Sequence, residues 1–466
     1  MSEDLVQRSA TELLQLLRER QLSAVELTRV YLERIERLNP RLGAYVLVRA
    51  EAAMVAAAEA DARIARDGDD LPPLLGLPVS IKDLADTADL PTSYGSRAFA
   101  DFVPERDAEV VARLKRAGAI VLGKTSTPEF GLRPTTEFGL HPPARNPWDL
   151  ARSAGGSSGG AAAAAAASLC ALAHGSDGGG SIRIPASLCG LVGLKPSRGR
   201  ISVAPRHGEG WAGLSTQGPL SQTVADAALF LDATAGPALG DPYWAPPPDE
   251  PFSASARRAP GWLRIGWATA TSEGAADAEV AAATHAAVET LARLGHAVEQ
   301  TTLETDGMWD ALWQIAAANT AALPITTPDL LEPHARATYE RGRALSAADY
   351  VSAVMRMHQG ARRLVAHLDR FDLLVTPTLP RTAPPLGTLG ADPATSAEEI
   401  HAFIPFTFPF NLTGQPAISL PLAHSADGLP IGVQLVGRPA GEGALLAVAA
   451  QLERALPWRA RRPPIA

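Results

Sequence analysis

Two short tracts rich in glycine and serine carry the residues most suited to chemistry. The first spans residues 155–160 and the second spans residues 176–183. Either tract alone could be a flexible linker, but apolar residues separate and follow them, which favours burial. Consecutive glycines that end in a serine can direct several backbone N–H groups to one point beside a hydroxyl, which is how an oxyanion hole is built next to a nucleophile. The serines of these tracts are therefore candidates for acyl-transfer chemistry.

A serine hydroxyl is a weak nucleophile unless a base activates it, and no well-placed His/Asp pair accompanies these serines. Lysine is scarce in the chain, because arginine supplies all but four of the 42 basic residues; the lysines are Lys82, Lys115, Lys124 and Lys195. Arginine keeps its proton inside a protein, whereas a buried lysine can lose it. Lys82, at the end of an expected strand, is the available base. Lys115 belongs to the polar face of a helix and needs no special explanation.

The elements that must position these residues alternate between helix and strand. Residues 9–38 predict two amphipathic helices, because Ser9 with Glu12 and Ser23 with Glu26 have capping-box spacing, and Pro40 is expected to end the second helix. Further helices are expected at 50–66, 108–117, 275–295 and 442–455, and strands at 74–82, 119–122, 170–174, 372–375 and on both sides of a turn at 426–428. The proline-rich segment 241–260 predicts a wrapping loop. The alternation predicts an α/β fold with a central mixed β-sheet covered by helices on both faces.

Seven motifs in this order resemble those of the amidase signature family. They lie at residues 76–83, 123–125, 155–160, 176–185, 193–196, 218–220 and 411–417. Agreement of several independent motifs in the right order is very rarely accidental. The resemblance covers most of the chain and implies the amidase signature fold in a single amidase domain over residues 1–466. Its expected parts are N-terminal helices at 9–66, a catalytic core at about 74–235, the loop 241–260, a variable helical substrate-pocket region at about 275–370, and C-terminal strands and a helix at 372–455.

The resemblance also implies roles for individual residues. In that family the residue at Ser181 attacks the carbonyl carbon, the residue at Ser157 relays the proton after a cis peptide bond, and the lysine at Lys82 is the base. The implied oxyanion hole consists of the backbone N–H groups of Gly178, Gly179, Gly180 and Ser181. The implied supporting residues are Ser158, Asp177 and Arg183. Asp177 and Arg183 resemble a pair that stabilises the nucleophile loop. In some relatives the arginine also reaches substrate carboxylates.

These implied roles make a physical demand on the lysine and leave two departures from the family pattern. Lys82 has to be uncharged in the resting enzyme, so burial must lower its pKa from about 10.4 by several units. Ser126 stands where many relatives have asparagine, and Ala154 stands where proline is frequent. We expect both near the pocket wall, where they bear on the substrate rather than on the catalytic residues.

Composition excludes several classes of function. The net charge of −8 over 466 residues gives no basic stripe for nucleic acid. No basic segment precedes an apolar run near residue 1, and the alanine-rich run 161–173 is too short to cross a bilayer, so neither a secretory signal nor a membrane span is expected. Cys170 and Cys189 predict core packing, with no metal site and no cofactor. We expect a cytoplasmic enzyme, a monomer or homodimer, with a small-molecule amide or carbamate substrate.

Two further patterns match well-known motifs without their structural context. Residues 118–125 satisfy GxxxxGK[ST], but the space between the glycines is an apolar expected strand and Pro128 interrupts the helix that should follow. Residues 155–159 satisfy GxSxG, but no strand precedes them, as a nucleophile elbow requires. Neither nucleotide binding nor an α/β-hydrolase site is predicted.

Isolated histidines and tryptophans near the motifs have a structural interpretation. His174 and His207 are expected to be structural. Trp309 and Trp313 share one helix face, and we expect core packing for them, with pocket lining as the alternative.

The leading functional hypothesis is a free-standing hydrolase of amides, and also of carbamates or esters. Residues 208–211 and 240–246 resemble the branch with nylon-oligomer cyclic-dimer hydrolases, aryl acylamidases and urethanases, which accept bulky apolar or aryl substrates. The alternative is an amidotransferase A-type subunit that releases ammonia from glutamine within a tRNA-dependent complex, although residues 199–204 depart from that pattern. A third hypothesis is a non-catalytic scaffold, which predicts no amide turnover.

Overall fold

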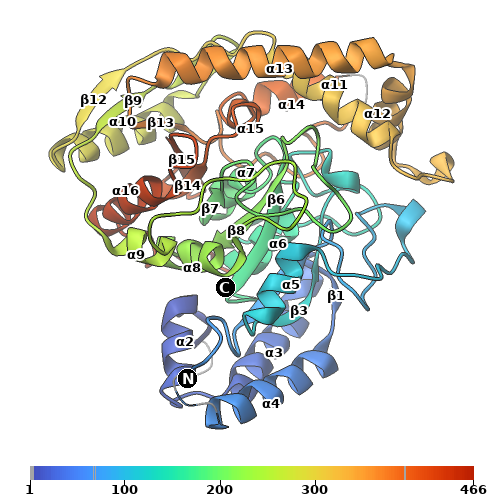
Figure 1. Ribbon diagram of the computed structural model, residues 1–466, viewed down its shortest axis with the longest axis vertical. Coiled ribbons are helices and arrows are strands. Elements are labelled where there is room, and N and C mark those ends of the chain that lie inside the picture. Colours follow the sequence, from blue (N-terminus) through green and yellow to red (C-terminus); the bar gives the residue numbers. More distant parts are fainter. Residues whose placement is uncertain (1–4, 67, 69, 393–394, 466) are drawn as a thin grey trace.

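In the computed structural model, which describes residues 5–66, 68, 70–392 and 395–465, most of the described strands form one large mixed sheet (Figure 1). Across the sheet its eleven strands are β1 (Tyr45–Val48), β3 (Ile120–Thr125), β2 (Pro78–Lys82), β6 (Leu172–Asp177), β8 (Thr216–Ser221), β7 (Val192–Lys195), β14 (Ala417–His424), β15 (Pro430–Gly437), β13 (Leu373–Pro377), β9 (Arg264–Trp267) and β12 (Ala297–Gln300). The pairs β3–β2, β2–β6, β13–β9 and β9–β12 are parallel, and the other neighbours are antiparallel. Two small antiparallel pairs stand apart: β4 (Arg145–Asn146) with β5 (Asp149–Ser153), and β10 (Ala270–Thr271) with β11 (Gly274–Ala275).

Helices pack around this sheet along most of the chain. They are α2 (Ala10–Arg18), α3 (Ala24–Leu42), α4 (Ala50–Arg66), α5 (Glu109–Arg116), α6 (Gly159–Ala166), α7 (Arg183–Cys189), α8 (Val224–Thr234), α9 (Phe252–Arg257), α10 (Ala278–Arg293), α11 (Met308–Ala321), α12 (Pro333–Ala344), α13 (Ala347–Leu368), α14 (Ser396–Phe403), α15 (Pro409–Leu412) and α16 (Glu442–Ala455). Short 3₁₀ turns lie at Arg97–Phe99, Glu129–Gly131 and Pro328–Leu330. The N-terminal helices α2–α4 lie at one end of the molecule, and α11–α13 lie at the other (Figure 1). The predicted α/β class and mixed sheet are confirmed.

The helix α6 lies at the centre of the fold, because all of its residues are buried. It packs against β2, which ends at Lys82, and against β6 and β8. Only small side chains allow such close packing. A Cβ atom on Gly160 would overlap the backbone of Ser126 and the carbonyl oxygen of Ala44. The Gly/Ser/Ala tract is thus a core helix and its entry turn, and it brings Ser157 to the ends of the neighbouring strands.

The N-terminal helices begin as predicted, but the second ends later. Both capping boxes, at Ser9 and at Ser23, are formed. Pro40 does not end α3, which continues to Leu42 and stops at Gly43 with a φ of 62°. The extra turn buries Leu42, and the Gly43 N–H closes the helix on the carbonyl of Asn39. Proline removes one hydrogen bond near the helix end, and the glycine cap and apolar burial offset that loss.

The proline-rich segment 241–260 contains a short helix, α9, so the expectation of a loop throughout is wrong. Pro251 precedes the helix, and the Asp232 carboxylate accepts from the N–H groups of Phe252 at 2.6 Å and Ser253 at 3.0 Å. The side chain of Phe252 is buried. A capping carboxylate from a different helix is invisible to local sequence patterns, which explains the difference.

Candidate active site

The end of strand β2 delivers Lys82 to the centre of the candidate site. Every residue of β2 is buried, and the Lys82 side chain is fully inaccessible to solvent. Its Nζ lies 2.7 Å from the Oγ of Ser157. It also lies 3.0 Å from the Oγ of Ser176 and 3.4 Å from the Ser176 carbonyl oxygen. The lysine nitrogen is therefore surrounded by hydroxyl and carbonyl oxygens.

Burial also decides the charge of this lysine. Desolvation lowers the pKa of Lys82 well below its ordinary value of 10.5, and the carboxylate of Asp177 opposes this shift only in part. No carboxylate forms an ion pair with Lys82 among the described residues. An uncharged amine is favoured because the surrounding oxygens do not offset the cost of burying a cation.

The two tract serines come together through the backbone. The Gly156–Ser157 peptide bond is cis. The N–H of Ser158 donates to the carbonyl oxygen of Ser181 at 3.2 Å, and its hydroxyl donates to the carbonyl oxygen of Ser176 at 3.2 Å. Ser157 is buried, Ser181 is half-buried, and both line the same cavity. In the described chain no hydrogen bond joins the hydroxyls of Ser157 and Ser181.

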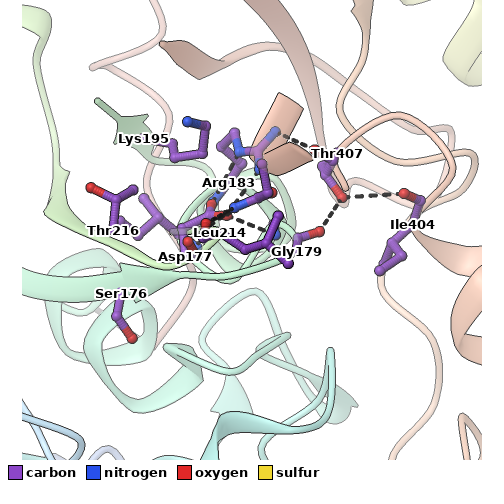
Figure 2. Close-up of polar contacts among 12 residues, drawn as sticks. Ser176, Asp177, Gly179, Arg183, Lys195, Leu214, Thr216, Ile404 and Thr407 are labelled. Atoms are coloured by element: carbon purple, nitrogen blue, oxygen red, sulfur yellow. Dashed lines mark hydrogen bonds and ion pairs between the residues drawn. The ribbon is translucent and has the colours of Figure 1, made fainter. Parts of the chain in front are cut away.

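A fully buried ion pair holds the loop that carries Ser181 (Figure 2). The Arg183 guanidinium donates to both carboxylate oxygens of Asp177, at 2.9 and 3.0 Å. Its remaining N–H groups donate to the oxygens of Thr407, Asn411 and Gln434, at 2.9, 2.7 and 2.7 Å. All five donors are thus occupied by protein, so Arg183 has none left for a substrate carboxylate. Ser176 and Asp177 point to opposite sides of β6, which separates the lysine pocket from this ion pair (Figure 2).

The Asp177 carboxylate also sets the shape of the loop. Burial by itself raises its pKa, but the Arg183 guanidinium and the amide of Asn411 outweigh burial, so the net pKa lies well below the ordinary value. The charged carboxylate accepts from the N–H groups of Gly180 at 2.8 Å and Ile182 at 3.1 Å. Gly180 is therefore an exception to the expected oxyanion hole, because its N–H is already bonded.

The other glycines of the loop keep their N–H groups available. Within the described chain, the N–H groups of Gly179 and Ser181 have no protein acceptor, and Gly178 lines the cavity. The Gly179 carbonyl oxygen is held from behind by the hydroxyl of Thr407 at 2.8 Å (Figure 2). The loop can thus present two N–H groups beside the hydroxyl of Ser181.

Ser181 stands where two cavities meet. The larger has a volume of about 530 Å³ and contains Ser157, Ser176 and Ser181 in its lining. Its aromatic wall consists of Tyr94, Phe99, Phe130 and Trp211. The smaller cavity, of about 40 Å³, also contains Ser181, and its apolar lining includes Trp309, Leu312, Trp313, Ile400 and Ile404. A scissile bond at Ser181 can therefore extend into a large and a small compartment.

Other residues singled out in the sequence lie outside the catalytic cluster. Lys124 belongs to a buried strand and donates to the oxygens of Ala85 and Thr92 at 2.7 Å, so residues 118–125 form no phosphate-binding loop. Lys195 is buried and donates to the Pro196 carbonyl oxygen at 3.0 Å. Ser126 and Ala154 are buried and line neither cavity, so the expectation that they lie at the pocket wall is wrong.

The histidines and tryptophans divide between core and cavity. His174 is buried and contacts both Lys82 and Gln217, whereas His207 is exposed and lines the large cavity. Trp309 and Trp313 stack with ring centroids 5.7 Å apart, and they belong to the core while also lining the small cavity. Both interpretations of the tryptophan pair therefore apply.

Several residues of the site were not found by sequence reasoning. They are Ser176 beside the lysine, Thr407 and Gln434 behind the nucleophile loop, and Gln217 and Trp211 in the cavity lining. Thr407 and Gln434 lie more than 200 positions from Ser181, so no local spacing could connect them. Ser176 lies inside the second Gly/Ser tract, and its place at a strand end was the signal that could have identified it.

The described residues meet the requirements of neither a metal site nor a membrane-spanning helix. Among the described residues, no cluster of three or more histidine, cysteine, aspartate or glutamate side chains is arranged to hold a metal ion. Within the same residues, no helix is both long and apolar enough to span a bilayer.

Comparison with known proteins shows the family of the chain. The family model described as Amidase matches residues 26–446. A putative amidase from Synechocystis sp. is 39% identical over 451 residues, which cover 96% of this chain and 88% of that protein. The solved structure of a 6-aminohexanoate cyclic dimer hydrolase complexed with substrate superposes with a TM-score of 0.92 at 35% identity, covering 99% of both chains. A bacterial aryl acylamidase of the amidase signature family superposes with a TM-score of 0.89 at 28% identity, covering 97% of this chain and 96% of that one.

The fold and the comparisons define an enzyme that hydrolyses amide bonds. The chain belongs to the amidase signature family.

Proposed function

We propose that the chain hydrolyses carboxylic amide bonds with Ser181 as nucleophile, Ser157 as proton relay and Lys82 as base. The observation that carries this proposal is the fully buried Lys82 Nζ, 2.7 Å from the Ser157 hydroxyl. A neutral amine has two N–H bonds and one lone pair. In the proposed neutral state the two N–H bonds donate to the two oxygens of Ser176, which leaves the lone pair to accept the proton of the Ser157 hydroxyl.

The proposed reaction consists of acylation and then deacylation of Ser181. The Ser181 Oγ bonds to the carbonyl carbon, its proton moves to Ser157, and the Ser157 proton moves to Lys82. The carbonyl oxygen becomes an oxyanion that accepts from the N–H groups of Gly179 and Ser181. The C–N bond then breaks while the relay returns the proton to the leaving nitrogen, which gives an acyl-enzyme. Water then attacks the acyl carbon and passes a proton to the same relay. The bond between the acyl carbon and the Ser181 Oγ breaks, the relay returns the proton to that oxygen, and the acid leaves.

The cavities support amides with one bulky part. A volume of about 530 Å³ is in the range that encloses a drug-sized ligand, and its aromatic wall suits aryl or extended apolar groups. Two relatives in the comparisons are named as a hydrolase of a cyclic dimer and an aryl acylamidase, which agrees with such substrates. Because the proposed steps need only a carbonyl carbon and a leaving group, we extend the proposal to aryl carbamates and esters.

A substrate screen tests the proposed function. The purified chain is incubated with p-nitroanilides, aliphatic amides and aryl carbamates, and Ser181→Ala serves as the matched variant. We expect turnover of at least one bulky or aryl amide by the wild-type chain and loss of that turnover in Ser181→Ala. Equal turnover by both would refute the assigned nucleophile. Turnover of a simple aryl amide by the isolated chain also separates this proposal from a partner-dependent subunit that acts on glutamine, which no observation favours.

A further inference from the structure

The proposed reaction leaves one polar side chain of the large cavity without a role. Gln217 on β8 is paired across the sheet with Ser176 on β6, so their side chains lie on the same face. That face also contains the Ser176 hydroxyl that contacts the Lys82 Nζ at 3.0 Å. Gln217 is half-buried and lines the large cavity. Its amide therefore lies on the cavity surface beside the catalytic cluster.

A neighbouring histidine fixes which end of this amide faces the cavity. The backbone N–H of Lys82 donates to Nδ1 of His174 at 3.3 Å, so Nδ1 carries no proton. Burial lowers the pKa of His174 to about 3, although its bond to Gln217 opposes the shift, so the ring is neutral near pH 7. A neutral imidazole with an accepting Nδ1 has its proton on Nε2. Nε2–H then donates to the Gln217 Oε1, at 2.8 Å.

The amide nitrogen of Gln217 is consequently the free end. No described residue accepts a hydrogen bond from its NH₂ group, and the oxygen cannot exchange places with the nitrogen, because Nε2–H of His174 requires an acceptor. The buried chain from the Lys82 backbone through His174 thus holds an amide donor in a fixed orientation. Such a donor can serve an oxygen of the substrate but not a substrate N–H.

We infer that the Gln217 amide nitrogen donates a hydrogen bond to a carbonyl or carboxylate oxygen in the part of the substrate that occupies the large cavity. The preferred substrates are then amides with a second carbonyl-type oxygen, besides that of the scissile bond. This inference rests on the proposed function. One hydrogen bond of this kind changes kcat/KM by roughly two- to tenfold.

Matched substrates measure this selectivity. One pair of p-nitroanilides, chosen from those that the wild-type chain hydrolyses, has acyl chains of equal length in which one CH₂ is replaced by a carbonyl. A second pair, of anilides, carries the same replacement in the amine part. The variants are Gln217→Met, which removes the donor, and Gln217→Glu, which keeps the acceptor for His174 but presents a carboxylate oxygen. The control is Asn319→Met, because Asn319 lines the same cavity but its amide nitrogen already donates to the Ile315 carbonyl oxygen at 2.9 Å.

The readout is the ratio of kcat/KM between the members of each pair. We expect the ratio for one pair to fall by roughly two- to tenfold in Gln217→Met, mainly through KM, and at least as far in Gln217→Glu. The ratio in Asn319→Met should match the wild type. Unchanged ratios for both pairs in the Gln217 variants would overturn the inference. An equal loss of kcat/KM for both members of each pair would also overturn it, because Gln217 would then only position His174. Failure of the proposed function would give a different result, because Ser181→Ala would then hydrolyse the same substrates as the wild type.

Discussion

At the scale of single residues, the protonation state of Lys82 decides whether the site can work. Its pKa is depressed in the folded chain by burial. Between this depressed pKa and the ordinary 10.5, the unfolded chain binds a proton on Lys82 that the folded chain does not. Burying Lys82 therefore costs stability below pH 10.5; the cost grows as pH falls through this window and disappears as pH rises to its upper end. Near neutral pH, burial of this amine therefore lowers the free energy of unfolding, and the proposed reaction requires the amine in its uncharged form.

This linkage predicts a pH-dependent difference between wild type and Lys82→Met. We expect the free energy of unfolding of the wild type, relative to the variant, to rise by about 1.4 kcal/mol per pH unit within the window. Denaturant unfolding at several values between about pH 8 and 10 measures it. A difference that does not vary with pH would mean that the folded chain keeps Lys82 charged.

Sequence reasoning identified Lys82 but could not rank it among the buried lysines by scarcity alone. Lys124 and Lys195 are equally rare and equally buried. Both Lys82 and Lys124 contact two hydroxyls. What distinguishes them is a carboxylate, because Lys124 forms an ion pair with Asp83 at 3.3 Å and Lys82 forms none among the described residues. Those neighbours come from other strands and loops, so scarcity and the place at a strand end made Lys82 a candidate, and the family resemblance implied its role.

At the scale of elements, the nucleophile loop depends on the different conformations of two adjacent glycines. Gly180 has a φ of 133°, and a Cβ there would lie 2.7 Å from a methyl carbon of Ile184. The nearest atoms to a Cβ on Gly179 lie 3.8 Å or more away. Only Gly180 thus requires glycine on steric and conformational grounds.

The two alanine variants should therefore differ. We expect Gly180→Ala to lower the free energy of unfolding by about 1–3 kcal/mol and to displace the Ser181 loop. Gly179→Ala should stay within about 0.5 kcal/mol of the wild type, since the added methyl makes only ordinary van der Waals contacts. Thermal unfolding of both proteins decides the matter. Equal stability of the two variants would contradict the loop geometry.

The sequence predicted most elements of the core, and its failures have local physical causes. Helix α16 and helix α4 begin and end where periodicity placed them. Helix α6 was concealed because Gly159 and Gly160 at its start resemble a loop, although here they permit close backbone contact. Helix α9 depends on the distant carboxylate of Asp232.

At the scale of the whole molecule, C-terminal strands complete a site whose chemistry lies in the N-terminal half. Gln434 on β15 accepts from Arg183 at 2.7 Å and donates to the oxygens of Thr376 and Phe406 at 2.9 and 2.8 Å. These contacts connect the nucleophile loop to segments far along the chain. The sequence reveals the glycine and serine motifs of the site but not the distant residues that support them. Residues far apart in the chain have no fixed spacing that a sequence pattern could identify.

Replacing Gln434 tests this long-range support. Gln434→Met leaves a buried guanidinium N–H without an acceptor, so we expect a loss of about 1–3 kcal/mol in stability and a lower kcat. Gln415→Met is the matched control, because Gln415 is also buried and donates to the Gly437 carbonyl oxygen at 2.8 Å but does not contact Arg183. The control should lose stability and keep its kcat, measured on folded protein. A similar drop in kcat for both variants would count against a specific role of Gln434.

The central claim is that an uncharged Lys82 activates Ser181 through Ser157. The most direct measurement is the rate at which a fluorophosphonate forms a bond to Ser181, with the modified residue identified by peptide mass spectrometry. We predict modification of Ser181 in the wild type, and a rate lower by a factor of about 10²–10⁴ in Lys82→Ala with the fold retained. Modification of Lys82→Ala at the wild-type rate, or modification of a residue other than Ser181 in the wild type, would contradict the account.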